Sequence, residues 1–247
     1  MPMPPLEVFI FAPLIVITAY VIFGISGFGS TVIAVPLLAH FMPLTVVIPV
    51  IVALDCVGAI TMGVRLRADV YKAELVPLLP FLMLGMLAGA YLLLELPGEI
   101  LLGGLGIFVA AYGVLYITGK QGGFRVGRWA VVPVGLFAGT TSSMFGVGGP
   151  IYVMYLTARG ATPEHIHATL PVIFIFTTIA RIVIFAVAGL FTTEVIYMAA
   201  ALLPIMALGM WSGHHLHLNL TREQLARIVG VLLVVSGGSL LVRALGS

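Results

Sequence analysis

The chain has 247 residues, of which 61% are hydrophobic and only 8% are charged, and its mean hydropathy is +1.22. Soluble domains carry about 25% charged residues, so this composition excludes a soluble protein and predicts an integral membrane protein. The net charge of +2 without a basic tract excludes a nucleic-acid-binding protein, and the single cysteine, Cys56, excludes an internal disulfide.

Apolar segments follow one another along the whole chain. Eight of them, at about 20 residues, are long enough to cross the bilayer as helices: residues 6–24, 44–63, 72–94, 98–118, 129–145, 163–190, 194–216 and 221–243. Two others are short, residues 30–42 and 149–158. Transmembrane strands are not expected, because the segments lack a period-two alternation. The sequence therefore predicts an all-α polytopic membrane protein.

Each short segment follows a cluster of glycines, Gly27-Phe28-Gly29 in one case and Gly146-Val147-Gly148-Gly149 in the other. Glycine disfavours a helix interior by about 1 kcal/mol relative to alanine, so each cluster predicts a break in the helix at membrane depth. Lipid cannot satisfy the backbone groups that a break leaves unpaired, and such backbone persists only inside protein or beside a wet cavity. Matching breaks in two halves of a chain point to the binding site of a transporter.

The two halves of the sequence resemble each other. Besides the glycine clusters, Pro43 matches Pro163, and Pro80 with Gly85 and Gly89 matches Pro204 with Gly209 and Gly213. Further matches are Glu99 with Glu223, Gly106 with Gly230 and Gly113 with Gly237. We expect a duplicated five-segment unit: a first transmembrane repeat at 1–118, a cytoplasmic linker at 119–128 and a second repeat at 129–247. The glycines four residues apart predict close contacts between helices.

Positive charges near the ends of the segments predict the topology. If each short segment forms a hairpin with the segment before it, only Arg243 lies opposite the others, which are Arg65, Arg67, Lys72, Lys120, Arg125, Arg128, Arg159, Arg222 and Arg227. If residues 129–158 instead formed one broken crossing, the split would be seven to three. The more uneven split predicts an inverted repeat with both termini in the periplasm.

Hydroxyl side chains accompany the glycines at both breaks. A short helix that begins at a break directs free N–H groups and the positive end of its dipole towards the centre of the membrane, which suits an anion. Pro150 fits the first turn of such a helix. The expected substrate-binding residues are Ser26, Gly27, Gly29, Ser30, Thr31, Thr141, Ser142, Ser143, Gly146, Gly148, Gly149 and Arg181. Alternatively, the glycines only allow close helix crossing and the hydroxyls bond to their own helix.

Two charged residues lie deep in apolar segments, Asp55 and Arg181. Charges inside a membrane are costly and commonly functional. When Pro49 is aligned with Pro171, Asp55 matches Thr177, and Arg181 lies one turn further along. One interpretation makes Arg181 an anchor for the substrate and Asp55 a proton carrier or the partner of Arg181. The other interpretation is a structural ion pair between the two segments.

Enzymatic chemistry has little support in the sequence. Ser142 and Ser143 could act as nucleophiles of an intramembrane protease, but an inverted duplication suits alternating access better than a single active site. His214, His215 and His217 have no carboxylate or thiol nearby in the sequence, so we expect no metal site. No cofactor is expected either.

The paired motifs resemble the sulfite exporter TauE/SafE family of membrane permeases, also called the toluenesulfonate uptake permease family. The resemblance rests on Gly27-Phe-Gly-Ser-Thr-Val-Ile-Ala-Val-Pro36-Leu-Leu and Gly146-Val-Gly-Gly-Pro-Ile-Tyr-Val-Met-Tyr-Leu156, each followed by a proline. It covers nearly the whole chain. The sequence departs from the family pattern at Ser30, where a third glycine is common, and its two repeats differ where Tyr155 stands opposite Pro36.

This resemblance implies a secondary transporter of a small sulfur-containing anion, such as sulfite or an organosulfonate, in the bacterial inner membrane. It further implies coupling to an ion gradient, of H+ or Na+. The expected partners are thus the anion, the coupling ion and the lipid bilayer, with no nucleic acid. A passive anion channel is the main alternative, and an intramembrane enzyme is a weaker one.

Overall fold

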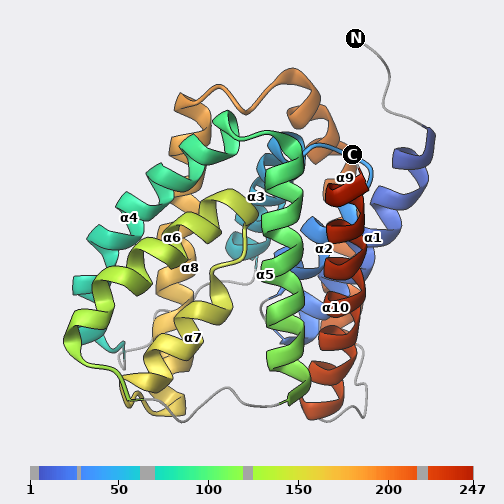
Figure 1. The fold of residues 1–247 in the computed structure, drawn as a ribbon. Coiled ribbons are helices and arrows are strands. Elements are labelled where there is room, and N and C mark those ends of the chain that lie inside the picture. Colours follow the sequence, from blue (N-terminus) through green and yellow to red (C-terminus); the bar gives the residue numbers. More distant parts are fainter. Residues whose placement is uncertain (1–5, 27–28, 62–69, 119–124, 216–221, 247) are drawn as a thin grey trace. The chain divides into compact units, whose positions relative to one another are not determined.

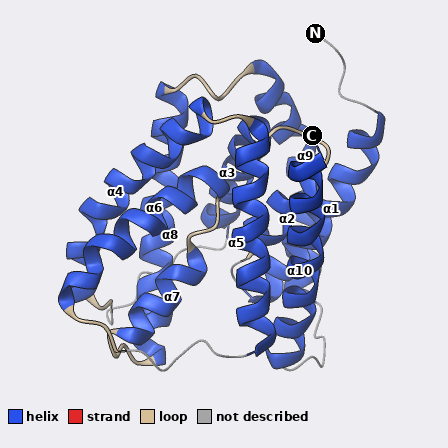
Figure 2. Cartoon of the chain, in the orientation of Figure 1, coloured by secondary structure: helices blue, strands red, loops and turns tan. Residues whose placement is uncertain are grey.

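The computed structural model describes residues 6–26, 29–61, 70–118, 125–215 and 222–246. Within these ranges every regular element is a helix, as Figure 2 shows, and no strand occurs. The helices are α1 (Leu6–Ser26), α2 (Ser30–Leu38), α3 (Leu44–Thr61), α4 (Lys72–Glu95), α5 (Gly98–Thr118), α6 (Val131–Phe145), α7 (Gly149–Ala158), α8 (Pro163–Val187), α9 (Thr193–His215) and α10 (Arg222–Gly246). A 3₁₀ turn at Arg128–Ala130 precedes α6.

The predicted all-α fold is confirmed for the described residues, and the protein is a multi-pass membrane protein. Five helices are long and apolar enough to span a bilayer: α4, α5, α8, α9 and Val229–Gly246 of α10. Ile10–Ile25 of α1 and Leu44–Gly58 of α3 are shorter apolar stretches. The two short helices expected after the glycine clusters are present as α2 and α7.

The helices form two compact units. The first comprises Met1–Gly58, Leu96–Gly119 and Leu190–Ser247, and the second comprises Ala59–Glu95 and Lys120–Gly189. The fourth helix of each sequence half thus belongs to the unit built around the first two helices of the other half: α4 lies with α6 and α7, and α9 lies with α1 and α2. The repeat boundaries at 118 and 129 are a different division of the chain, and they stay a prediction.

In the first unit, α5 lies along α10 and α1 lies along α9 (Figure 1). Glycines set the distance between α5 and α10. A Cβ atom at Gly106 would lie 2.9 Å from the carbonyl oxygen of Gly237, and one at Gly113 would lie 2.7 Å from that of Gly230. Because real Cβ atoms do not approach backbone so closely, these helices pack at a separation that only glycine permits.

In the second unit, α4 lies along α6 (Figure 1). Cβ atoms at Gly85 and Gly89 would collide with the carbonyl oxygens of Leu136 and Thr140. The first unit has the same arrangement, with Gly209 against Ile17 and Gly213 against Val21. The close contacts predicted from the glycine spacing are thereby confirmed in both units.

Candidate functional site

The chain breaks between α6 and α7, where the sequence predicts it. Helix α6 ends at Phe145, and Gly146 adopts a left-handed conformation with φ of 75°. Its N–H group donates to the carbonyl oxygen of Ser142, which closes the end of α6. This conformation costs a residue with a Cβ atom about 1–2 kcal/mol of conformational energy, which explains why glycine occurs here. After Gly148, α7 begins at Gly149 with Pro150 in its first turn.

The second break, between α1 and α2, has a related geometry. Helix α1 ends at Ser26, and α2 begins at Ser30 directly after Gly29, whose φ is 97°. No atom outside its chain neighbours lies within 4 Å of a Cβ built on Gly29, so the need for glycine there comes from the backbone angle alone. Gly27 and the side chain of Ser26 lie outside the described residues.

Arg181 reaches the end of α6 from α8. Its side chain is buried, with 5% of its surface exposed. Its Nε donates to the carbonyl oxygen of Thr177 at 3.4 Å, and its Nη1 donates to that of Ser142 at 3.5 Å. Both distances lie beyond the usual range of about 2.7–3.2 Å. The structure therefore places this guanidinium beside the α6–α7 break, held by long contacts to carbonyl oxygens.

The hydroxyls of α6 divide into two groups. Thr141 donates to the carbonyl oxygens of Phe137 and Ala138, so its hydroxyl bonds back to its own helix. The Oγ of Ser143, by contrast, is buried and has no hydrogen-bond partner among the described residues. A buried polar group without a partner is costly, so Ser143 is a better candidate for contact with a ligand than Thr141.

Tyr152 of α7 also belongs to this break, although the sequence reasoning missed it. Its side chain is 1% exposed. Its hydroxyl lies so close to Gly148 that a Cβ atom there would collide with it. The Ser142 hydroxyl and the Arg181 charge are its polar neighbours, but the Tyr152 hydroxyl makes no hydrogen bond of ordinary geometry among the described residues. Its only sequence signal is a tyrosine in the first turn after a glycine break.

The α1–α2 break contains a carboxylate instead of a guanidinium. Asp55 of α3 accepts hydrogen bonds on Oδ1 from Tyr20 at 2.7 Å and from Ser30 at 2.9 Å. Its Oδ2 accepts one from Thr31 at 2.8 Å. Ser30 and Thr31 are the first two residues of α2. Two of the three hydroxyls expected to bind substrate at this break therefore bind Asp55, and Tyr20 is a further donor that the sequence did not reveal.

Asp55 belongs to the first unit and Arg181 to the second, and a pairing between the two stays a prediction. In both units the charged side chain comes from the helix that follows the short helix, α3 after α2 and α8 after α7. The two breaks thus lie beside charges of opposite sign, the carboxylate of Asp55 in one unit and the guanidinium of Arg181 in the other.

An ion pair connects the far end of α7 to α4. Arg159, just after α7, donates to Glu74 at 2.7 Å and to the carbonyl oxygen of Val126 at 2.7 Å. The hydroxyl of Tyr155 donates to the other oxygen of Glu74 at 2.6 Å. The hydrogen bond and charge of Glu74 raise the pKa of Arg159 above its ordinary value. This network fixes the end of the short helix opposite the break, and the sequence did not reveal it.

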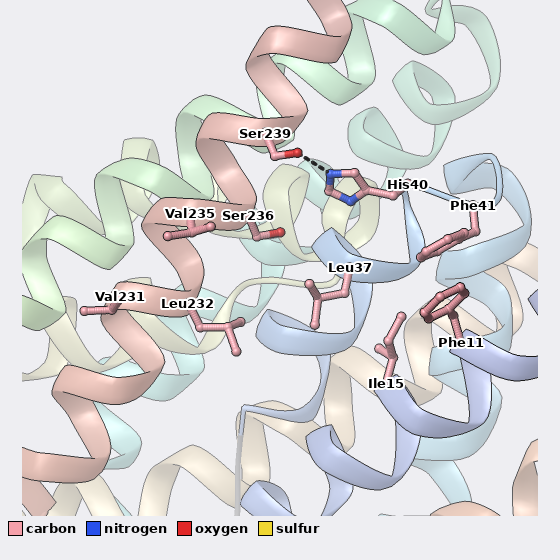
Figure 3. Close-up of a pocket in the computed structure, with 10 residues that line it drawn as sticks. All are labelled: Phe11, Ile15, Leu37, His40, Phe41, Val231, Leu232, Val235, Ser236 and Ser239. Carbon is pink, nitrogen blue, oxygen red and sulfur yellow. Dashed lines mark hydrogen bonds between the residues drawn. The ribbon is translucent and has the colours of Figure 1, made fainter. Parts of the chain in front are cut away.

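The first unit also contains an apolar groove. It has a volume of about 870 Å³ and is lined by α1, α2 and α10 (Figure 3). Most of its lining is aliphatic or aromatic, including Phe11, Leu37 and Val235. His40, one of its few polar residues, hydrogen-bonds to Ser239 at 2.9 Å. Such a lining does not match a small hydrophilic anion, which needs several converging donors.

The described residues contain no group of three His, Cys, Asp or Glu side chains that could hold a metal ion. At the α6–α7 break the Arg181 guanidinium lies beside Ser142 and Tyr152, and the buried hydroxyl of Ser143 belongs to the same last turn of α6. Buried, positively charged and rich in donors, this arrangement is suited to holding an anion.

Comparison with known proteins gives one match. The family model described as "Sulfite exporter TauE/SafE" matches residues 12–240, which is most of the chain and includes both breaks. No curated protein and no solved structure matches the chain.

Proposed function

The chain belongs to the sulfite exporter TauE/SafE family, and from this premise we propose that it moves a small sulfur-containing anion, such as sulfite or an organosulfonate, across the bacterial inner membrane by alternating access. As a member of that family it is a membrane transporter and not an enzyme. The substrate, the coupling to an H+ or Na+ gradient, the cellular membrane and the residue roles given below are parts of the proposal.

The observation that carries the proposal is the environment of Arg181. An arginine at the centre of a bilayer costs at least ~2.5 kcal/mol on insertion scales, so the fold must compensate its charge. In its own unit the guanidinium makes long contacts to the carbonyl oxygens of Thr177 and Ser142. An oxyanion would supply short, charge-assisted hydrogen bonds in their place. The N–H groups at the start of α7 add a partial positive charge to the same place.

The other residues of the proposed anion site come from the same break. Gly146, Gly148 and Gly149 expose backbone between α6 and α7, and Ser142 and Ser143 supply hydroxyls beside it. We assign Thr141 a supporting role, because its hydroxyl is bonded within α6.

Asp55 is our candidate for the coupling site. Its carboxylate accepts hydrogen bonds from three hydroxyls, and the oxygens of such hydroxyls can also coordinate a cation bound beside it. Ser30 and Thr31 then serve the coupling ion through Asp55, whereas the anion binds at the other break. Gly29 supports this arrangement through the backbone angle that starts α2.

The packing of glycines supports the inverted duplication. On α5 and α10, Gly106 meets Gly237 and Gly113 meets Gly230, so these helices are antiparallel. In the sequence repeat, Gly106 corresponds to Gly230 and Gly113 to Gly237. Exchanging the halves therefore converts one contact into the other, as a two-fold axis perpendicular to both helices requires. If these helices span the bilayer, that axis lies in the membrane plane, which is the symmetry of an inverted repeat.

The same contacts bear on the topology. If each short helix continued the crossing of the helix before it, both halves would have four crossings and α5 would run parallel to α10. The antiparallel pair supports the hairpin arrangement instead, in which each half has an odd number of reversals. That arrangement leaves Arg243 alone among the peripheral Lys and Arg residues and predicts both termini in the periplasm.

Counterflow into proteoliposomes tests the proposed function. Vesicles containing the purified protein and unlabelled sulfite should accumulate labelled sulfite transiently above its outside concentration. Sulfoacetate, thiosulfate and chloride should be compared in the same preparation. A carrier gives this overshoot with at least one sulfur anion, whereas a passive channel only equilibrates the label. Absence of overshoot with every sulfur anion would contradict the proposal.

Variants of Arg181 then test the site. Arg181→Ala should fold yet lose anion-dependent thermal stabilisation, and Arg181→Lys should recover only part of it, because an ammonium lacks the planar fork that matches an oxyanion. If Arg181 only neutralises Asp55, Arg181→Ala should instead lower the stability of the anion-free protein, and adding Asp55→Ala should restore it. Wild-type stabilisation by sulfite in a folded Arg181→Ala protein would remove Arg181 from the site.

A further inference from the structure

We propose that the hydroxyl of Tyr152 donates a hydrogen bond to an oxygen of the transported anion, and that this residue helps the α6–α7 break to select oxyanions. The inference rests on the proposed function and adds to it a residue that neither the sequence motifs nor the family match assigns.

The first reason is that the Tyr152 hydroxyl is buried and, although the Ser142 hydroxyl lies near it, makes no hydrogen bond of ordinary geometry among the described residues. Only 1% of the side chain is exposed. Buried polar groups are almost always hydrogen-bonded, and an exception calls for a physical explanation such as a ligand. Phenylalanine would fill the same volume without an unsatisfied donor. A tyrosine here is therefore explained if a bound anion supplies the missing acceptor.

The second reason is the position of the hydroxyl within the break. It occupies the space that a side chain at position 148 would need, and a Cβ atom at Gly148 would also lie 3.0 Å from the Cβ of Ser142. The ring makes an edge contact with Phe174, with ring centroids 6.2 Å apart and planes at 63°. Phe174 in turn lies against Gly149. The phenol is thus held in place between the end of α6 and the start of α7.

The third reason is the chemistry of the neighbouring groups. Arg181 lies near Tyr152, and Ser143, in the last turn of α6, carries another buried hydroxyl without a partner among the described residues. A guanidinium and two hydroxyls can all donate hydrogen bonds at once. Such a set fits an anion that presents several unprotonated oxygens in different directions, as sulfite, thiosulfate and sulfonates do. In the first repeat, Ile33 corresponds to Tyr152, and that break holds Asp55 instead of a guanidinium.

Tyr152→Phe tests the proposal, because it removes the hydroxyl and retains the ring. Thermal unfolding of the purified protein should be measured over a series of sulfite concentrations, together with sulfite counterflow. Without sulfite, the variant should be as stable as the wild type or more stable, since it loses an unsatisfied group. The apparent affinity for sulfite should fall roughly 10-fold to 100-fold, as expected for a hydrogen bond to a charged group.

Tyr155→Phe is the matched control on the same helix. Its hydroxyl is also largely buried but donates to Glu74, so its removal should lower stability without sulfite and leave the sulfite affinity unchanged. A Tyr152→Phe protein that is less stable without sulfite would show a structural hydroxyl and overturn the inference. So would wild-type sulfite affinity in a stable variant. If the wild-type protein shows no counterflow with any sulfur anion, the proposed function fails first, independently of Tyr152.

Discussion

Two adjacent glycines of α10 allow a sharp test of the helix packing. Gly237 faces α5: a Cβ atom there would lie 2.7 Å from the backbone N of Ala110 and 2.7 Å from the carbonyl oxygen of Gly106. Gly238 has nothing within 4 Å of its Cβ position. Gly237→Ala and Gly238→Ala therefore add the same methyl group to the same helix, one residue apart, in opposite environments.

The expected cost of Gly237→Ala follows from these distances. A Cβ atom at 2.7 Å is about 0.7 Å short of ordinary van der Waals contact, and both of the nearest atoms belong to backbone that cannot rotate away. Helices α5 and α10 would have to separate along their contact. Overpacking of this kind typically destabilises by about 1–3 kcal/mol. Gly238→Ala should leave stability unchanged or raise it by up to about 1 kcal/mol, because alanine is the better helix former.

Thermal unfolding in a mild detergent, followed by the loss of monodisperse protein on size-exclusion chromatography, measures this difference. We expect a lower midpoint for Gly237→Ala and an equal or higher midpoint for Gly238→Ala, both compared with wild type. Equal midpoints for the two variants would refute the reasoning, since they would mean that α5 and α10 do not meet at Gly237. A lower midpoint for Gly238→Ala alone would mean that α5 packs against the face of α10 that carries Gly238, and it would also refute the reasoning.

Three further predictions concern the breaks, the topology and the ion pair. Gly29→Leu and Gly148→Leu should each abolish sulfite counterflow while the protein still inserts in the membrane. Leucine at position 29 cannot easily adopt the positive φ, and leucine at position 148 would collide with Tyr152. Near-normal transport by both variants would show these glycines to be ordinary packing residues. With Cys56 replaced by alanine, Gly98→Cys should react with an impermeant thiol reagent from the periplasm, and Gly127→Cys should react only after the membrane is opened. Both positions are exposed, and the hairpin topology puts them on opposite sides of the membrane. Labelling of both from one side would contradict that topology. Arg159→Ala should lower the unfolding midpoint more than the double variant with Glu74→Gln does, because the single change leaves a largely buried carboxylate without its cation. An equal decrease in both variants would mean that the ion pair does not contribute to the stability of the protein.

The positions of the breaks could be predicted from sequence because their cause is local. Glycine clusters are poor helix formers wherever they occur, and Gly29 and Gly146 adopt the positive φ that explains them. The close helix contacts were also predictable, since spacing of four residues puts two glycines on one helix face. The packing partners were not, because they depend on which helices meet: α4 contacts α6 from the other half of the sequence.

The hydrogen-bond partners at the breaks were harder to predict for the same reason. Tyr20 is 35 residues from Asp55 in sequence, and Glu74 is 85 residues from Arg159. Arg159 was read only as a charge at a membrane surface, and the sequence contains no local sign that a carboxylate of α4 lies beside it. Tyrosines in apolar segments look like core residues until their hydroxyls can be placed. Side-chain chemistry was thus visible in the sequence, whereas its pairing required the fold.

The difference between the two breaks has a consequence for the mechanism. Thr177 corresponds to Asp55 in the repeat, and the carbonyl oxygen of Thr177 accepts a hydrogen bond from Arg181. In this alignment the first half has the carboxylate of Asp55, and the corresponding Thr177 of the second half lies against the guanidinium of Arg181. A symmetric pair of breaks would compete for the same anion, because each short helix would direct its positive end towards it. In this chain Asp55 of α3 accepts hydrogen bonds from Ser30 and Thr31 at the start of α2, and its negative charge opposes a second anion there. In the proposed function this directs the anion to the α6–α7 break and leaves the α1–α2 break for a proton or cation.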